Sequence, residues 1–278
     1  MSSFVKLDID DHVAVVTLNR PDRLNAIGNE MGRQFDEIMV RLALDFAVRA
    51  VILTGEGRGF CAGADMERIT TLIGDDRAVS RLMPTDGVHR TFLPLTELAP
   101  RELLTRYNCP QALSQPVIAA VNGPCAGIGL ALAVMSDVRF ASSAAFFVAP
   151  FARRGLTAET GIASSLPALI GFGHAADMLL SGRRVTAPEA LHMGLVNRLC
   201  EPGALLPEAL AYAHDLARNV SPRSTHRIKR QLWRARSQEF SVAADDAIEE
   251  YKLSMTSEDF KEGVAHFKEK RAPRFTGR

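Results

Sequence analysis

The alternation of apolar and polar residues along the chain predicts a sheet of short strands with helices between them. A hairpin is expected over residues 4–18, where apolar positions alternate or run together on both sides of an acidic turn. Apolar residues at helical spacing predict a helix between residues 25 and 42. Apolar, β-branched runs at 50–54 and 116–121 predict buried central strands.

The remaining pattern continues the alternation of strands and helices. Further helices are expected over 64–73, 128–135, 160–170, 174–180 and 188–193, and strands over 137–141, 145–148 and 195–200. From residue 207 onward the chain reads as charged helices with an apolar stripe. Residues 74–113 contain four prolines and predict short helical pieces broken by loops. An α/β core with a C-terminal helical layer follows from this order.

Two glycine-rich stretches, residues 55–66 and 121–130, each follow a buried strand and lead into a helical segment. The first N–H groups of a helix lack intrahelical partners, and the helix dipole adds positive potential there. Two such turns facing one another would form a pocket for a developing negative oxygen. The alternative is that these glycines only permit tight turns.

Composition narrows the class of protein. The chain has 278 residues, 47% hydrophobic and 23% charged, with a net charge of +1, which favours a soluble globular protein without nucleic acid or a membrane surface as its main partner. Its four cysteines are widely spaced, which argues against a zinc site or a disulfide framework and suits a reducing compartment. We therefore expect no metal. Since the N-terminus lacks the apolar stretch of a signal peptide, we also expect a cytoplasmic protein.

Sequence phrases at 18–26, 59–65 and 119–123, the last followed by 136–141, stand in an order and spacing that resemble the enoyl-CoA hydratase/isomerase (crotonase) superfamily. The resemblance covers nearly the whole chain. It implies an α/β crotonase-like (ClpP/crotonase) spiral of ββα units. Residues 1–200 would form this core with an acyl-CoA site, and 201–278 a helical layer for trimerisation. A homotrimer or a dimer of trimers is therefore expected, with residues 74–113 over the acyl pocket or packed locally as a satellite core.

The same resemblance assigns the carbonyl-binding donors to the backbone N–H groups of Ala64 and Ile128. Many relatives have a glycine where Ile128 stands, but isoleucine still supplies the amide. Coenzyme A enters as part of the substrate, and no separate cofactor is expected. The resemblance implies that coenzyme A is contacted by Arg23, Leu24, Ala62, Ala64, Asp65 and Met66. Lys270 would contact the coenzyme A in a neighbouring active site. A solvated helix face is the alternative for the basic tail around Lys270.

The two catalytic carboxylates of the resembling hydratases are missing, because Ala131 and Phe151 stand at their positions. One carboxylate remains in the region: Glu159 matches the catalytic glutamate in the Pro-Glu-Gly turn of peroxisomal-type Δ3,Δ2-enoyl-CoA isomerases. Its apolar neighbours would raise its pKa and make it a better base. Alternatively, Glu159 only favours a helix N-terminus or pairs with Arg153 or Arg154.

These residues favour double-bond isomerisation of an enoyl-CoA, with Glu159 moving the proton between C2 and C4 of the acyl chain. Hydration by a modified site is the first alternative. A non-catalytic acyl-CoA binder, which kept the pocket and lost the carboxylates, is the second. A nucleotide-dependent oxidoreductase is disfavoured, because the glycine spacing at 55–59 does not fit a dinucleotide-binding loop.

Overall fold

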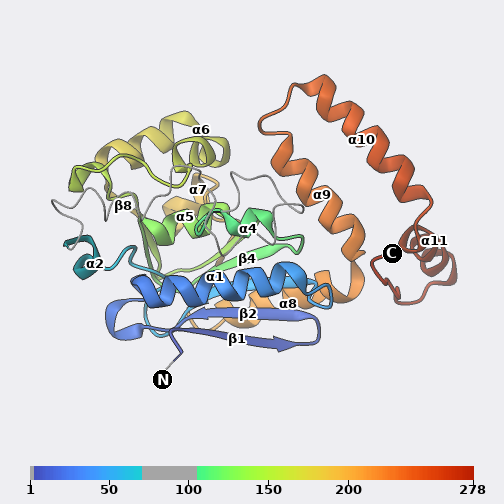
Figure 1. Cartoon of the computed structure of the whole chain (residues 1–278), viewed down its shortest axis with the longest axis horizontal. Helices are drawn as coiled ribbons and strands as arrows, with labels where there is room; N and C mark the ends of the chain where they lie inside the picture. The colour runs from blue at the N-terminus through green and yellow to red at the C-terminus, as the bar shows by residue number, and fades with distance from the viewer. Residues whose placement is uncertain (1–2, 71–104) are drawn as a thin grey trace.

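Two sheets form the centre of the molecule (Figure 1). The computed structural model describes residues 3–70 and 105–278. The larger sheet has the order β1-β2-β3-β4-β6-β9 and the smaller one the order β5-β7-β8. The strands are β1 (Val5–Asp10), β2 (Val13–Leu18), β3 (Ala50–Gly55), β4 (Val117–Val121), β5 (Pro124–Ala126), β6 (Val138–Ser142), β7 (Phe146–Val148), β8 (Arg184–Thr186) and β9 (Arg198–Cys200). From β2 to β9 the larger sheet is parallel, so its strands need crossover connections.

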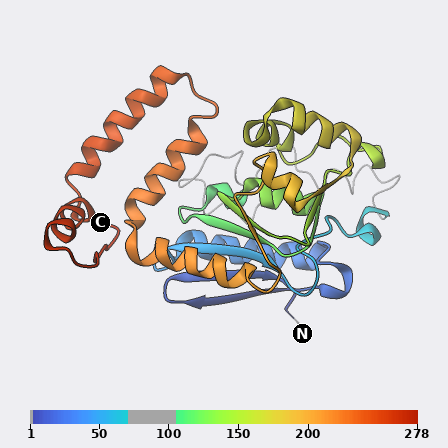
Figure 2. The same ribbon diagram turned by 180° about the vertical axis from the view of Figure 1, so that it is seen from behind.

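Helices cover both faces of the larger sheet (Figures 1 and 2). The longer ones are α1 (Asn29–Leu44), α5 (Ile128–Met135), α6 (Ile162–Ser181), α8 (Leu205–Asn219), α9 (Pro222–Arg234), α10 (Phe240–Met255) and α11 (Glu258–Glu269), and the shorter ones are α2 (Met66–Thr70), α4 (Cys109–Ala112) and α7 (Ala187–His192). Along β3 the side chains alternate between two cores. Val51 and Leu53 face the core of α1 and α5, whereas Ile52 faces the core of α8.

The structure confirms the α/β architecture and most predicted elements. The hairpin forms as β1 and β2, and the helix over 128–135 has the predicted bounds. The helix predicted from residue 25 begins only at Asn29, because Leu24 and Asn25 have left-handed backbone angles that a right-handed helix excludes. The three-residue strands β5 and β8 were not predicted, since such short segments carry no readable alternation.

The helices predicted over 160–170 and 174–180 form one element, α6, with a break at Gly171 (φ 76°, ψ 158°). By length and composition α6 alone among the described helices could span a membrane, but one such helix is weak evidence, and α6 packs on α5 in the core. Of the pieces predicted over 74–113, residues 74–104 lie outside the described residues and 109–112 form α4.

The last three helices form an arm, α9 to α11, that extends from the core beside α8 (Figures 1 and 2). None of the residues of α10 is buried. The arm is fixed to the core by the buried ammonium of Lys229 on α9. Its Nζ lies 2.7 Å from Asp137 Oδ2 and donates to the carbonyl oxygens of Pro110 and Gln115, both at 2.8 Å. Trp233 Nε1 donates to the other oxygen of Asp137 at 2.9 Å.

This anchor yields a prediction about stability. Lys229→Ala leaves Asp137 and two carbonyl oxygens in the interior without their charged donor, so we expect a loss of about 3–5 kcal/mol in the free energy of unfolding. Urea denaturation followed by circular dichroism measures it. Lys252→Ala, on the exposed α10, is the control and should change the free energy by less than about 0.5 kcal/mol. Equal values for the two variants would contradict the anchoring role.

Candidate functional site

The two glycine-rich turns meet at the carboxyl ends of β3 and β4. Main-chain hydrogen bonds join them: the N–H groups of Phe60 and Cys61 donate to Pro124 O at 3.2 and 3.1 Å. Ala126 N donates back to Cys61 O at 2.9 Å, which pairs Cys61 with Cys125 as in a parallel sheet. Because this pairing runs forward along both segments, the residues that follow, Gly63 and Gly127, also lie side by side.

Glycine is required in these turns by close backbone approach. A Cβ atom at Gly129 would lie 2.2 Å from Cys61 O, a distance that no side chain can take. At Gly63 (φ +102°) a Cβ would approach Ala126 O to 3.0 Å and Ile128 N to 3.7 Å. Gly127 also has a positive φ, of 54°, at the start of α5. The glycines therefore do more than permit a turn, since they bring the two chain segments into contact.

The N–H groups of Ala64 and Ile128 have no acceptor within residues 3–70 and 105–278. Several main-chain groups beside them are already hydrogen-bonded. Gly63 O accepts from Ile27 N at 2.8 Å, Asp65 N donates to Ile27 O at 3.1 Å, and Gly127 N donates to Val148 O at 3.1 Å. Ile128 N belongs to the first turn of α5, where intrahelical acceptors do not exist. Two adjacent donors are thus available to a ligand oxygen.

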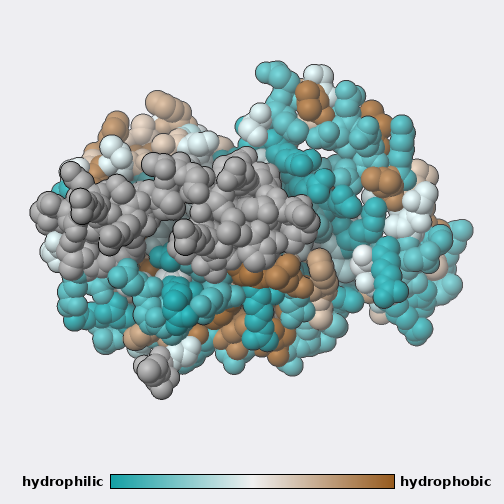
Figure 3. Space-filling view, viewed as in Figure 1, coloured by the Kyte–Doolittle hydropathy of each residue, from teal (hydrophilic) through white to brown (hydrophobic). Residues whose placement is uncertain are grey.

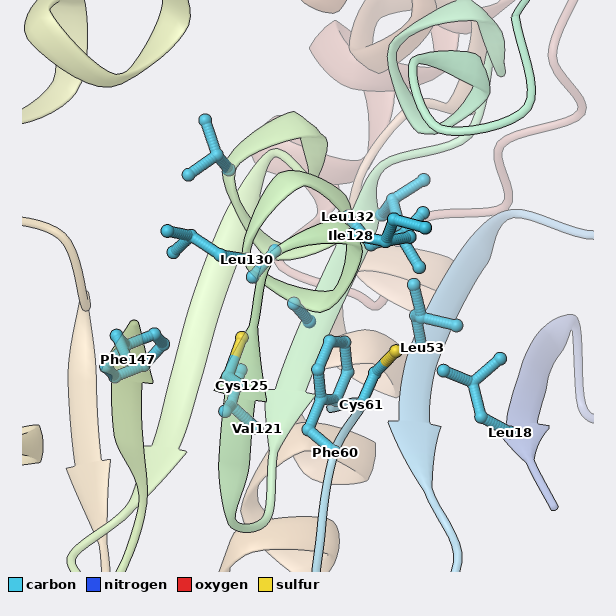
Figure 4. Close-up of a cluster of buried hydrophobic side chains, with 14 of the residues drawn as sticks. Leu18, Leu53, Phe60, Cys61, Val121, Cys125, Ile128, Leu130, Leu132 and Phe147 are labelled. Carbon is cyan, nitrogen blue, oxygen red and sulfur yellow. The ribbon is translucent and has the colours of Figure 1, made fainter. Parts of the chain in front are cut away.

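The helix that carries Ile128 lies entirely in the core. All eight residues of α5 are buried, and Figure 4 shows Ile128 beside Leu132 in a cluster that includes Leu53. Ile128 retains 7% exposure. Ala131 and Phe151, which the resemblance places where hydratases have carboxylates, are both buried, and Phe151 belongs to this apolar cluster. The dry surroundings strengthen any hydrogen bond from the Ile128 amide to a negative oxygen.

Glu159 lies in the connection that leads into α6. Its carbonyl oxygen accepts from Ile162 N at 3.1 Å and Thr160 Oγ1 at 2.7 Å, and the residue is half-buried. A Cβ at Gly161 would lie 4.0 Å from Met135 Cε, so this turn sits beside the last residue of α5. Of the apolar neighbours expected around Glu159, Ile162 and Leu166 are buried, whereas Leu156 is 45% exposed.

The residues expected to contact coenzyme A divide into two groups. Arg23, Leu24, Ala62, Asp65 and Met66 gather with Ala64 around the first glycine turn, where Ala62 N donates to Leu24 O at 2.9 Å. Lys270 ends α11, which lies at the opposite end of the molecule from α2 (Figure 1). One chain therefore does not bring Lys270 to this site. Within the described ranges, no group of three His, Cys, Asp or Glu could hold a metal.

Two asparagines that sequence reasoning did not single out hold the first glycine turn. Asn25, fully buried, donates from Nδ2 to Glu56 O and Gly59 O at 3.0 and 2.7 Å. Asn122 Nδ2 lies within 3.2 Å of three carbonyl oxygens of the same turn. A side-chain amide can satisfy backbone groups that a tight turn leaves unpaired, but the carbonyl oxygens bound by Asn25 lie more than 30 residues away in the sequence, so this role became visible only in the folded chain.

The residue after Ala64 is fixed by an ion pair. Arg20 Nη1 donates to Asp65 Oδ2 at 2.5 Å, and Asp65 Oδ1 accepts from Glu67 N at 3.0 Å. The hydrogen bond from Arg20 holds the pKa of Asp65 below its usual value, with desolvation opposing the shift. Asp65 is 8% exposed, so its carboxylate is held against the turn.

This ion pair predicts a pH-dependent contribution to stability. Because the pKa of Asp65 is lower in the folded state, its stabilisation is present above the unfolded value and is lost as the pH falls through the folded value. We expect Asp65→Asn to reduce the free energy of unfolding by about 1–3 kcal/mol at pH 7. The difference from the unsubstituted chain should shrink below about pH 4. Chemical denaturation across pH tests this, with exposed Asp22→Asn as the control; a difference that stays constant to about pH 3 would contradict it.

Comparison with known proteins identifies the family of this chain. The enoyl-CoA hydratase/isomerase family model matches residues 8–90 and 97–278. A probable enoyl-CoA hydratase of Mycobacterium bovis is 37% identical over 283 residues, covering 99% of this chain and 94% of the relative. The 1,2-epoxyphenylacetyl-CoA isomerase of Escherichia coli is 32% identical over 285 residues, covering 100% of both.

Among solved structures, an enoyl-CoA hydratase subunit I from Geobacillus kaustophilus matches with a TM-score of 0.85 at 32% identity, covering 100% of both chains. The sequence and the α/β architecture thus agree over the full length. The chain belongs to the enoyl-CoA hydratase/isomerase (crotonase) superfamily.

Proposed function

We propose that this acyl-CoA enzyme isomerises a Δ3-enoyl-CoA to its Δ2 form through a thioester enolate. The observation that carries the proposal is the pair of adjacent amides, Ala64 N and Ile128 N, without acceptors in the described part of the chain. Each would donate to the thioester oxygen and stabilise the enolate by roughly 3 kcal/mol. The N-terminal end of α5 adds positive potential at the same oxygen.

Glu159 is our choice for the proton shuttle. Its carboxylate would take a proton from C2, the electron pair would move to form the enolate, and the resulting acid would return the proton at C4 as the carbonyl reforms. The turn that carries Glu159 adjoins Met135, seven residues along α5 from Ile128, a rise of about 10 Å. Because C2 is bonded to the thioester carbon, the Glu159 side chain would have to extend from this turn along α5 towards Ile128 to reach it.

Isomerisation is preferred over hydration because Ala131 and Phe151 are buried and apolar where two carboxylates would be needed. Hydration requires one group to activate water and another to protonate carbon, whereas a single base suffices for the proton shift. One relative is named an isomerase and another a hydratase, so family membership alone does not choose between the reactions.

Coenzyme A would lie along the first glycine turn. Arg23, Leu24, Ala62, Asp65 and Met66 surround that turn and would contact the pantetheine and adenine parts of the substrate. We further propose that Lys270 serves the active site of a neighbouring copy. Residues 1–200 would then hold the acyl-CoA site and 201–278 the oligomerising region, in a cytoplasmic trimer or dimer of trimers.

Glu159→Gln tests the reaction. With a 3-enoyl-CoA as substrate, we expect kcat for formation of the conjugated 2-enoyl-CoA, followed by its ultraviolet absorbance, to fall by about 10²–10⁴-fold while binding persists. Glu201→Gln, an exposed glutamate outside the site, is the matched control and should keep full activity. Unchanged migration in Glu159→Gln would remove the assignment. Water addition to a 2-enoyl-CoA would favour the hydratase, and binding without either reaction would favour the non-catalytic binder.

The apolar surface of the arm supports the oligomer. Phe240 is 87%, Leu232 66% and Tyr251 65% exposed, and Figure 3 shows apolar side chains interspersed over this region. We expect Phe240→Asp to lower the mass measured by light scattering from that of a trimer or hexamer towards that of one chain, because a carboxylate is costly in an apolar interface. Phe172→Asp, on the equally exposed part of α6, is the control. A mass unaffected by Phe240→Asp, or a monomeric parent chain, would contradict the arm's role.

A further inference from the structure

A second pocket opens at the amino ends of the parallel strands. Arg49, directly before β3, and Ser114 and Gln115, shortly before β4, form part of its wall, and the first turn of α9 and the last residues of the chain complete it. The glycine turns follow the other ends of the same strands. Since β3 spans six residues, about 20 Å separates the two ends, and the pocket is distinct from the candidate active site.

The pocket has the size and the charge of a site for an anionic small molecule. Its volume is about 470 Å³, which is within the range of small-molecule sites. Within residues 3–70 and 105–278, the lining includes Arg49, Arg223, Arg278, His12 and His226 and no aspartate or glutamate. Phe46, which is 74% exposed, adds an aromatic surface to the same wall.

Among the described residues, the three arginines of this wall have no acidic partner. None of the three guanidinium groups lies within 4.0 Å of a carboxylate anywhere in residues 3–70 and 105–278. Arg49 donates to the carbonyl oxygens of Ala217 and Phe275 at 2.9 and 3.0 Å, and Arg223 Nη1 donates to Ser254 Oγ at 2.9 Å. Each guanidinium has five N–H donors, so most remain available.

The carboxylate of Asp259 lies behind this wall and is already hydrogen-bonded to groups of the protein. Asp259, 3% exposed, accepts from Ser221 Oγ at 2.5 Å and from the N–H groups of Thr276 and Gly277 at 2.8 and 3.0 Å. Its own N–H donates to Arg278 O at 2.9 Å, so the carboxyl end of the chain is held there as well. These bonds fix the tail in place and leave the Arg278 side chain to the pocket.

His226 contributes a neutral hydrogen-bonding group. Burial and the nearby Arg227, Arg230 and Lys229 lower its pKa to about 4, so the imidazole is uncharged at neutral pH, although Glu250 opposes the shift. Its ring nitrogens have no partner among the described side chains and backbone groups. A neutral imidazole both donates and accepts hydrogen bonds, which suits a ligand hydroxyl or phosphate oxygen.

We propose that this pocket binds a phosphorylated small molecule of nucleotide size, with Arg49, Arg223 and Arg278 contacting the phosphate and Phe46 covering its planar ring. Arginine is suited to phosphate because its planar fork makes two parallel hydrogen bonds. The ligand would contact both the core and the arm, since Arg49 belongs to the first and Arg223 to the second. Binding therefore holds α9 against the amino ends of β3 and β4.

Titration calorimetry on the full chain tests the proposal with adenosine 5′-monophosphate, pyrophosphate and adenosine as probes. We expect the monophosphate to bind, adenosine to bind at least about tenfold more weakly, and Arg223→Gln and Arg278→Gln each to weaken the monophosphate at least about tenfold. Arg41→Gln, an exposed arginine on α1, is the matched control and should bind as the parent does. Thermal denaturation of each variant establishes that it is folded.

Three results would overturn the proposal. One is the absence of binding of the monophosphate and of pyrophosphate up to millimolar concentration. Another is unchanged affinity in both Arg223→Gln and Arg278→Gln. The third is loss of binding in Arg23→Gln instead, because that would place the nucleotide at the proposed coenzyme A site.

Discussion

The main-chain pairing between Cys61 and Cys125 is the constraint on which the candidate site depends. Three hydrogen bonds of 2.9 to 3.2 Å join the two glycine turns and set Gly63 against Gly127. Without them, Ala64 N and Ile128 N would belong to separate turns with no fixed relation. Burial raises the pKa of the Cys61 thiol to about 12, so this side chain acts as an apolar filler and not as a nucleophile. The same burial protects the pairing from water.

The surrounding fold fixes the two glycine turns in position. The two strands that end in the turns, β3 and β4, lie beside each other in the sheet, with cores on both faces. Asn25 and Asn122 bind the carbonyl oxygens of residues 55–59, and the Arg20–Asp65 pair fixes the segment after Ala64. Donors whose positions are set before the substrate arrives need little reorganisation during the reaction, which is the physical source of electrostatic catalysis.

Much of the fold was predictable, because strong patterns carry it. The run at 50–54 and the helix at 128–135 are nearly uniform in hydrophobicity, and both appear as expected. The start of α1 was not predictable, since Leu24 and Asn25 have left-handed angles and the Asn25 side chain is bonded to residues more than 30 positions away as well as to Arg20. The glycine turns and the missing carboxylates could be read from the sequence. The roles of Asn25, Asn122 and Arg20 required the folded chain, because their partners are main-chain atoms or a distant carboxylate.

The two amides of the site have a consequence for how its chemistry can change. A backbone N–H is present whatever side chain a residue other than proline carries, so the donor at Ile128 does not depend on its isoleucine side chain. Changes of side chain at positions such as Ala131 and Phe151 would therefore leave these two main-chain donors in place. The main-chain groups that would stabilise an anion and the side chains that would move protons lie on different segments, so a new acid or base on a nearby turn could change the reaction without altering the oxygen-binding donors.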